Sequence, residues 1–150
     1  MARINPYITF NGNCEEAFLF YKSVFGGEFV FMGRFSEMPG EYSVPEQDKN
    51  LVMHVSLPIG NGETILQGSD TSASTGGVAT PGTNFSISIG ADTQTETEDL
   101  FAKLSAGGKI TMPLANTFWG SYFGTVTDRF GIQWMVSFDP NLAGDSSANS

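Results

Sequence analysis

Two stretches of the sequence share a pattern that decides the fold. The first, Glu15–Lys22, reads EEAFLFYK and is followed by Gly26-Gly27; the second, Glu96–Lys103, reads ETEDLFAK and is followed by Gly107-Gly108. At one fixed offset the first glutamate, a Leu-Phe pair, the final lysine and both glycine pairs coincide. A self-similar pattern at a fixed spacing is typical of a structural unit that occurs twice. The sequence therefore predicts an internal duplication.

Each stretch carries the signals of an amphipathic helix with defined ends. Asn13, with Glu16 three residues later, is expected to cap the first helix, and Thr93 or Thr95 the second. The glycine pairs suit the left-handed conformation that follows a helix C-terminus. Apolar residues recur at helical spacing in both, at Ala17, Phe20, Tyr21 and Val24 and at Leu100, Phe101 and Leu104.

Alternating apolar and polar residues predict strands before and after each helix. Residues 7–10 and 85–89 precede the two helices, and a strand follows each glycine pair. Later strands are expected at 51–59 and 64–67, around the hairpin signal Gly60-Asn61-Gly62, and at 122–127 and 132–138. Each half thus reads βαβββ. We predict one domain over 1–142, with modules at about 4–70 and 83–140, a linker at 71–82 and a disordered tail at 143–150.

Composition excludes several classes of function. The 150 residues carry a formal charge of −9, which disfavours nucleic acid and anionic membrane surfaces as partners. No apolar run is long enough to span a membrane, and the start lacks the apolar core of a signal peptide. The single cysteine, Cys14, fits a reducing compartment. We expect a cytoplasmic protein.

Strand alternation also predicts which residues lie opposite the helices. Ile8, Phe10, Ile87, Ile89, Trp134, Val136 and Phe138 are expected under the helices. The other face then carries small, uncharged polar residues, among them Tyr7, Thr9, His54, Ser56, Asn84, Ser86 and Ser88, together with Met135. Such residues suit a concave site with placed hydrogen-bonding groups. A solvated sheet face, or an interface with a second copy, are the alternatives.

Several motifs resemble one protein family. They are Pro6–Asn13 (PYITFNGN), Glu16-Ala17, Phe20-Tyr21, Met53–Val55, Ser69-Asp70, Thr117–Gly120 and Gly124–Met135 (GTVTDRFGIQWM). Together these resemble the PhnB-like branch of the vicinal oxygen chelate superfamily, which includes glyoxalase I, bleomycin-resistance proteins and extradiol dioxygenases. The resemblance spans roughly residues 4–138. It implies an α+β fold in which two βαβββ modules form a curved, mostly antiparallel eight-stranded sheet. We also predict a homodimer, because the sheet edges are exposed and aromatic residues are in surplus. Members of the superfamily commonly form dimers.

Enzymes of this superfamily usually hold a divalent metal with four His, Glu or Gln side chains. The resemblance places these positions near Asn5, at Leu66 or Gln67, at Asn84 and at Met135. Asparagine is a poor ligand for such metals and methionine a soft one, so Gln67 alone is suitable. No cofactor is therefore expected, and a divalent metal is the alternative.

His54 is the only histidine. It can act as a general base or as a lone metal ligand, because imidazole titrates near neutrality; the alternative is a structural hydrogen bond within the sheet. Trp119 and Tyr122 are predicted to line the pocket as an aromatic wall, with ordinary core packing as the alternative.

Three functions follow from these residues. The first is binding of an unidentified small molecule in the sheet cavity, with Tyr7, Thr9, His54, Gln67, Asn84, Ser86, Trp119, Tyr122 and Met135 as lining residues. The second is a metal-assisted lyase or isomerase that uses His54 and Gln67. The third is sequestration of a drug or metabolite by a resistance protein. A methyltransferase is not favoured, because no glycine-rich loop of the nucleotide-binding type joins a strand to a helix.

Overall fold

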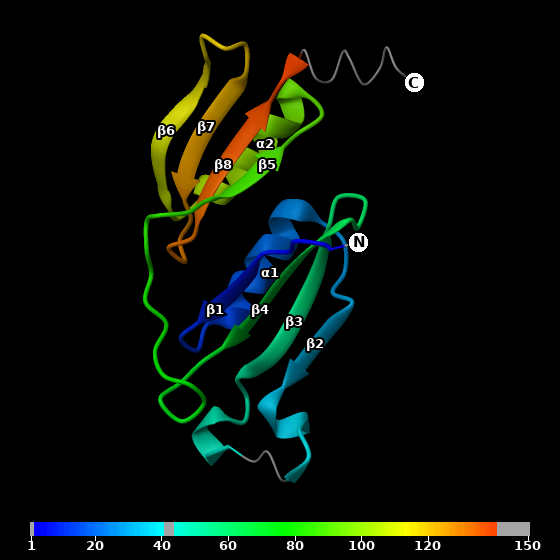
Figure 1. The fold of residues 1–150 in the computed structure, drawn as a ribbon, viewed down its shortest axis with the longest axis vertical. Coiled ribbons are helices and arrows are strands. Elements are labelled where there is room, and N and C mark those ends of the chain that lie inside the picture. The colour runs from blue at the N-terminus through cyan, green and yellow to red at the C-terminus, as the bar shows by residue number, and fades with distance from the viewer. Residues whose placement is uncertain (1, 41–43, 141–150) are drawn as a thin grey trace. The chain divides into compact units, whose positions relative to one another are not determined.

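The computed structural model describes residues 2–40 and 44–140. The chain divides into two compact units, with the boundary between Thr80 and Pro81. Each unit runs strand, helix and three further strands, as the duplication predicts (Figure 1). The expected tail at 143–150 lies outside the described residues, and the arrangement of the modules as one domain stays a prediction.

The first unit contains a four-stranded mixed sheet and one helix. Its order along the sheet is β1-β4-β3-β2, where β1 pairs with β4 in parallel and the other pairs are antiparallel. Short 3₁₀ turns at Phe35–Glu37 and Glu46–Asp48 lie between the second and third strands. The elements are β1 (Tyr7–Phe10), α1 (Cys14–Phe25), β2 (Phe31–Arg34), β3 (Val52–Ile59) and β4 (Thr64–Asp70).

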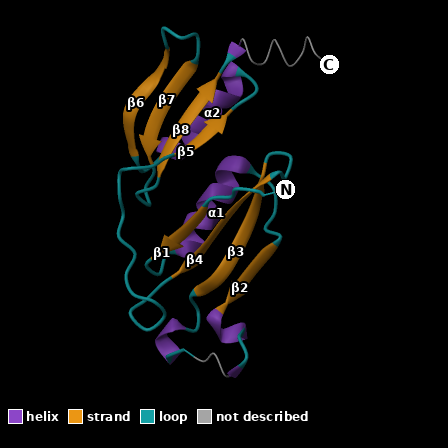
Figure 2. Ribbon diagram, viewed as in Figure 1, coloured by secondary structure: helices purple, strands orange, loops and turns teal. Residues whose placement is uncertain are grey.

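The second unit repeats this topology. Its sheet runs β5-β8-β7-β6, again with one parallel pair, β5 with β8, and two antiparallel pairs (Figure 2). The elements are β5 (Ile87–Gly90), α2 (Gln94–Ser105), β6 (Lys109–Asn116), β7 (Tyr122–Thr127) and β8 (Gln133–Phe138). The predicted α+β class with two βαβββ modules is confirmed. Within the described part of the chain, neither helix has the length and apolar character needed to cross a membrane.

In each unit the helix covers one face of the sheet, and the core lies between them. In α1, Phe18 and Tyr21 are fully buried and meet edge to face, with ring centroids 5.5 Å apart. Phe18 lies directly on β4, because a Cβ at Gly68 would come within 2.6 Å of its ring. In the second unit, Phe101 of α2 lies against Gly124 of β7 in the same way, at 2.6 Å. Both cores therefore depend on a glycine beneath an aromatic ring.

The cap predicted for α1 is wrong in its residue. Asn13 makes no side-chain capping bond. Instead the buried carboxylate of Asp70, at the end of β4, accepts hydrogen bonds from the backbone N–H of Gly12 (3.0 Å), Cys14 (2.9 Å) and Val52 (2.9 Å). One acidic group thus joins the start of the helix to two strands.

The cap predicted for α2 is confirmed at Thr93, whose hydroxyl accepts from the N–H of Glu96 at 3.0 Å. Two strand predictions need correction. β4 continues to Asp70, beyond the expected end at residue 67. β5 begins at Ile87, two residues after the expected start. A register shift between Gly33 and Arg34 also interrupts the pairing of β2 with β3, and Val52 is buried at this point.

Candidate functional site

The open face of the first sheet, away from α1, carries the candidate site. Backbone pairing aligns Tyr7 with Gln67, Gln67 with Ser56 and Ser56 with Phe31 in one row across the four strands. In the next row Thr9 pairs with Ser69, and His54 with Gly33. We call the side chains of these two rows the first-module face: Tyr7, Thr9, Phe31, His54, Ser56, Gln67 and Ser69.

His54 lies at the centre of the first-module face, with a partner at each ring nitrogen. Its Nε2 lies 2.9 Å from Ser56 Oγ, and its Nδ1 lies 3.4 Å from the Tyr7 hydroxyl, at the long limit of a hydrogen bond. A neutral imidazole donates from one nitrogen and accepts at the other, so the three groups form a chain Tyr7–His54–Ser56. This chain holds the ring in a fixed orientation.

Two aromatic rings flank His54. The Tyr7 centroid lies 5.7 Å and the Phe31 centroid 5.8 Å from the imidazole centroid. Both rings are about half exposed, at 49% and 47%. The Phe31 ring lies over Gly33, where a Cβ would come within 2.8 Å of its Cζ. Phe31 is a site residue that the alternation did not find, because its strand is short and contains this glycine.

The second module lacks this cluster. Its pairing registers, Ile87 with Trp134 and Val126 with Trp134, match those of Ile8 and Val55 with Gly68. Counting from this match, the position of His54 is occupied by Thr125 and that of Ser56 by Thr127. The position of Tyr7 falls on Ser86, which precedes β5. Gln67 is matched by an identical residue, Gln133. Among the described residues, the combination of histidine and aromatic rings is confined to the first module.

The remaining residues predicted for the pocket are placed as follows. Met135 lies on the open face of the second sheet, between Ser88 and Thr125. Asn84 and Ser86 are exposed and precede β5. Trp119 is exposed in the turn before β7 and contacts Phe118 and Phe123.

The side chain of Tyr122 lies on the helix side of β7, opposite the open face of the sheet. Gly124 and Val126, at the same alternation, are buried, and Gly124 lies against the Phe101 ring of α2. Phe123, at the opposite alternation, instead shares the open face of the second sheet with Met135. The ring of Trp119 therefore contacts Phe123 on this face and not Tyr122, and an aromatic wall of a ligand pocket stays a prediction.

The donors at the expected metal positions do not fit a divalent ion of the usual kind. Leu66 is buried under the helix, which resolves the register in favour of Gln67. The side-chain oxygen of Asn5 already accepts from the N–H of Ile65 at 2.9 Å. The other two positions offer the amide of Asn84 and the thioether of Met135, which are weak ligands for hard cations. Over residues 2–40 and 44–140, no three His, Cys, Asp or Glu side chains are grouped for metal binding.

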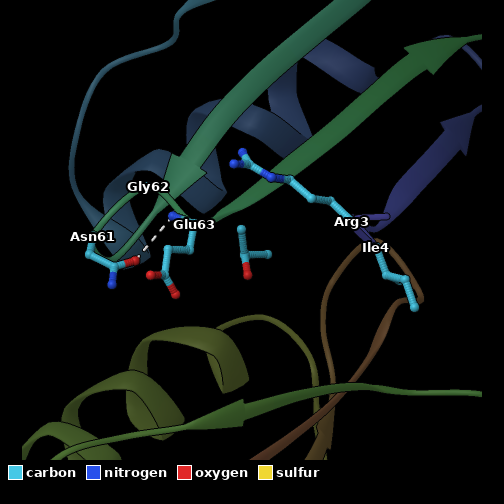
Figure 3. Close-up of a pocket in the computed structure, with 6 residues that line it drawn as sticks. Arg3, Ile4, Asn61, Gly62 and Glu63 are labelled. Carbon is cyan, nitrogen blue, oxygen red and sulfur yellow. Dashed lines mark hydrogen bonds between the residues drawn. The ribbon is translucent and has the colours of Figure 1, made fainter. Parts of the chain in front are cut away.

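A surface pocket of about 500 Å³ lies elsewhere in the first unit (Figure 3). Arg3 and Ile4 border it on one side, and the turn from Asn61 to Thr64 borders it on the other. All of its lining residues are exposed, and none belongs to the first-module face. This pocket therefore brings no buried polar group toward a ligand.

Cys14 is unsuited to nucleophilic chemistry. The thiol is fully buried at the start of α1. Burial raises the pKa of the Cys14 thiol far above its ordinary value, and the negative charges of Asp70 and Glu15 raise it further. The position at a helix start, which can lower the pKa of a thiol, is outweighed here by burial.

Comparison with known proteins identifies the family. A family model described as 3-demethylubiquinone-9 3-methyltransferase matches residues 2–137. The chain belongs to this family. It is the PhnB-like branch of the vicinal oxygen chelate superfamily, in agreement with the sequence motifs. Protein YjdN of Escherichia coli (strain K12) is 32% identical over 140 residues, which are 89% of this chain and 93% of YjdN.

Three solved structures have the same fold. Protein PA1353 from Pseudomonas aeruginosa is 37% identical, with a TM-score of 0.81 over 93% of this chain and 98% of that protein. A PhnB protein from Bacillus cereus is 27% identical, with a TM-score of 0.70 over 91% and 99% of the two chains. A glyoxalase-related enzyme from Fulvimarina pelagi, at 23% identity and a TM-score of 0.59 over 93% and 90%, shares the fold.

Proposed function

We propose that this PhnB-like protein binds a small organic molecule on the first-module face, around His54, without the metal that the enzymes of its superfamily usually hold. One observation carries the proposal: the imidazole of His54 is oriented by Tyr7 and Ser56 and lies between two half-exposed aromatic rings. Large aromatic surfaces beside a few placed polar groups are typical of ligand sites.

The chemistry of the face supports binding more directly than catalysis. Ser56 lies beside a potential base, but the backbone N–H groups around it belong to the sheet ladder and are not directed at a common point. An oxyanion would therefore find no preorganised donors, which acyl transfer requires. Cytoplasmic location and assembly into a homodimer, in which the exposed strand edges would be covered, remain part of the proposal.

A fragment screen tests the proposal. Because His54 is the only histidine, its imidazole gives a single set of C–H resonances in the NMR spectrum of the whole protein. We expect members of a soluble fragment library to shift these resonances, and a His54→Gln variant to lose affinity for the same fragments. The matched control is Gln133→Ala, on the equivalent face of the second module, which should keep the affinity. A library that leaves the imidazole resonances unchanged would refute binding at this face.

A metal-assisted lyase or isomerase is the second candidate. His54 and Gln67 lie on the same face of the adjacent strands β3 and β4. They stand in neighbouring rows of this face, since Gln67 pairs with Ser56, so both side chains can approach one ion. Two protein donors are fewer than the three that catalytic zinc sites use. Elemental analysis of the purified protein, before and after chelation, decides between the candidates. A stoichiometric metal that is lost from a His54→Gln variant would replace the metal-free proposal.

The methyltransferase in the family's description is not part of the proposal. In the described residues the connections from β1 to α1 and from β5 to α2 are short, at 11–13 and 91–93, and each contains at most one glycine. A methyl donor with a nucleoside group is usually bound by a glycine-rich loop at such a connection. Sequestration of a drug is a use of the same binding face, and a cell-protection assay distinguishes it from binding of a metabolite.

A further inference from the structure

The first-module face has no permanently charged side chain. None of its residues is Lys, Arg, Asp or Glu, and its only basic group is the imidazole of His54. Arg34 is the last residue of β2, and its side chain is directed to the helix side of the sheet. There it pairs with Glu15 of α1 at 2.6 Å. A carboxylate or phosphate ligand would therefore meet no guanidinium or ammonium donor, the groups that usually bind such anions.

The aromatic rings favour the opposite charge. The face of a Tyr or Phe ring carries negative electrostatic potential and attracts a cation within about 6 Å of its centroid. Tyr7 and Phe31 expose about half of their surface on either side of His54. The net charge of −9 adds a long-range field that concentrates cations around the protein.

We propose that the ligand of the first-module face is an organic cation with an alkylated ammonium group, held against the rings of Tyr7 and Phe31. Polar groups elsewhere on the ligand then meet His54, Ser56 and Gln67, which both donate and accept hydrogen bonds. This inference rests on the proposed function, because it names the chemical class of the molecule that the face binds.

Three probes of nearly equal shape test the charge of the ligand. Choline, 3,3-dimethyl-1-butanol and 3,3-dimethylbutanoate share a head of three methyl groups and are cationic, neutral and anionic. Each is titrated into the wild-type protein while the His54 imidazole resonances are followed by NMR. We expect choline to shift them with an affinity about fivefold or more above that of the alcohol, since cation–π attraction adds to the same apolar contact. The carboxylate should leave them unchanged.

Two variants test the rings. Tyr7→Leu and Phe31→Leu should each weaken choline binding by about two- to thirtyfold, the range expected for one cation–π contact, while binding of the alcohol changes less. The matched control is Phe85→Leu, an aromatic residue that is 64% exposed and lies outside the first-module face. It should keep the affinity of the wild type.

The outcomes separate this inference from the proposed function. If the alcohol or the carboxylate binds as tightly as choline, the preference for a cation is refuted, but the face still binds ligands. If choline has no effect while library fragments shift the His54 resonances, the same conclusion holds. If neither the three probes nor the library shifts them, the proposed function is refuted together with the inference.

Discussion

Replacing Gly33 by alanine should move the Phe31 ring away from His54 while the fold stays intact. A Cβ at this position would lie 2.8 Å from Phe31 Cζ and 2.9 Å from Cε1, whereas ordinary contact begins at 3.4 Å. The ring must therefore shift by at least the difference, 0.6 Å, between the closest approach and that limit. It can do so, because it is the far end of a flexible, half-exposed side chain.

Two opposing effects set the change in stability. Loss of the contact between the Phe31 and His54 rings should cost about 0.5–1.5 kcal/mol. Gly33 does not need a positive φ, so alanine also stabilises the folded state by about 0.4–1 kcal/mol through the lower entropy of the unfolded chain. The free energy of unfolding should therefore change by no more than about 1 kcal/mol. The chemical shifts of the His54 imidazole, in contrast, should change, because a neighbouring ring has moved.

Urea unfolding and NMR of the single imidazole measure both quantities. Gly90→Ala is the matched control, since Gly90 also lies in a strand without a positive φ and a Cβ there would meet nothing within 4 Å. The control should gain stability without any change at His54. Unchanged imidazole shifts in Gly33→Ala would refute the placement of the ring over the glycine. A loss of stability above about 2 kcal/mol would show that the ring cannot yield.

Three further predictions concern the frame of the first module. Asp70→Asn should lower the free energy of unfolding by about 2–4 kcal/mol in urea titration, because an amide nitrogen would face the buried N–H of Val52 in place of a carboxylate oxygen; a change below 0.5 kcal/mol, roughly that of a neutral surface substitution, would contradict this role. Cys14 should not react with a disulfide reagent at pH 8 until urea unfolds the protein, because burial raises its pKa; rapid reaction of the folded protein would show that α1 opens. Arg34 lowers the pKa of Glu15 chiefly through their hydrogen bond. The pair should therefore stabilise the folded protein at pH values above the pKa of Glu15 in the unfolded chain, about 4.3. This contribution should be lost as the pH falls through the lower pKa of Glu15 in the folded protein. Because both groups are partly exposed, a double-mutant cycle at pH 7 should give about 0.2–1 kcal/mol, and an equal coupling at pH 2 would refute the assignment.

The sequence predicted the modules because the signals that define them are local. Helical spacing, strand alternation and the glycines at turns each depend on a few neighbouring residues. The hairpin at Gly60–Gly62 and the strand at residues 122–127 follow the prediction closely. The cap of α1 did not, because its acceptor, Asp70, lies far along the chain, and only the parallel pairing of β1 with β4 brings it to the helix.

The candidate site could be predicted only in part, for the same reason. The alternating pattern within each strand was enough to place Tyr7, Thr9 and His54 on one face. The choice between Leu66 and Gln67 needed the register of β4 against β1, which no local pattern encodes. Phe31 was missed because its ring lies over Gly33, where only a residue without a side chain leaves room for it.

The duplication provides an internal test of what the fold itself requires. Two positions on the helix side of the sheets are matched in kind between the modules: Ile8 corresponds to Ile87, and Val55 to Val126. The position of His54 is different, since the second module has Thr125 there and still forms the same sheet with the same strand order. A histidine is therefore not needed to build this face.

The same holds for the ring beside it, because the position of Tyr7 falls on Ser86 in the second module. Folding alone thus explains neither residue, nor why a half-exposed aromatic surface, which is unfavourable in water, is kept next to the only histidine. An occupant that covers this surface for part of the time would explain both. Because the second module has no histidine at the corresponding position, the first-module face is where a ligand should be sought first.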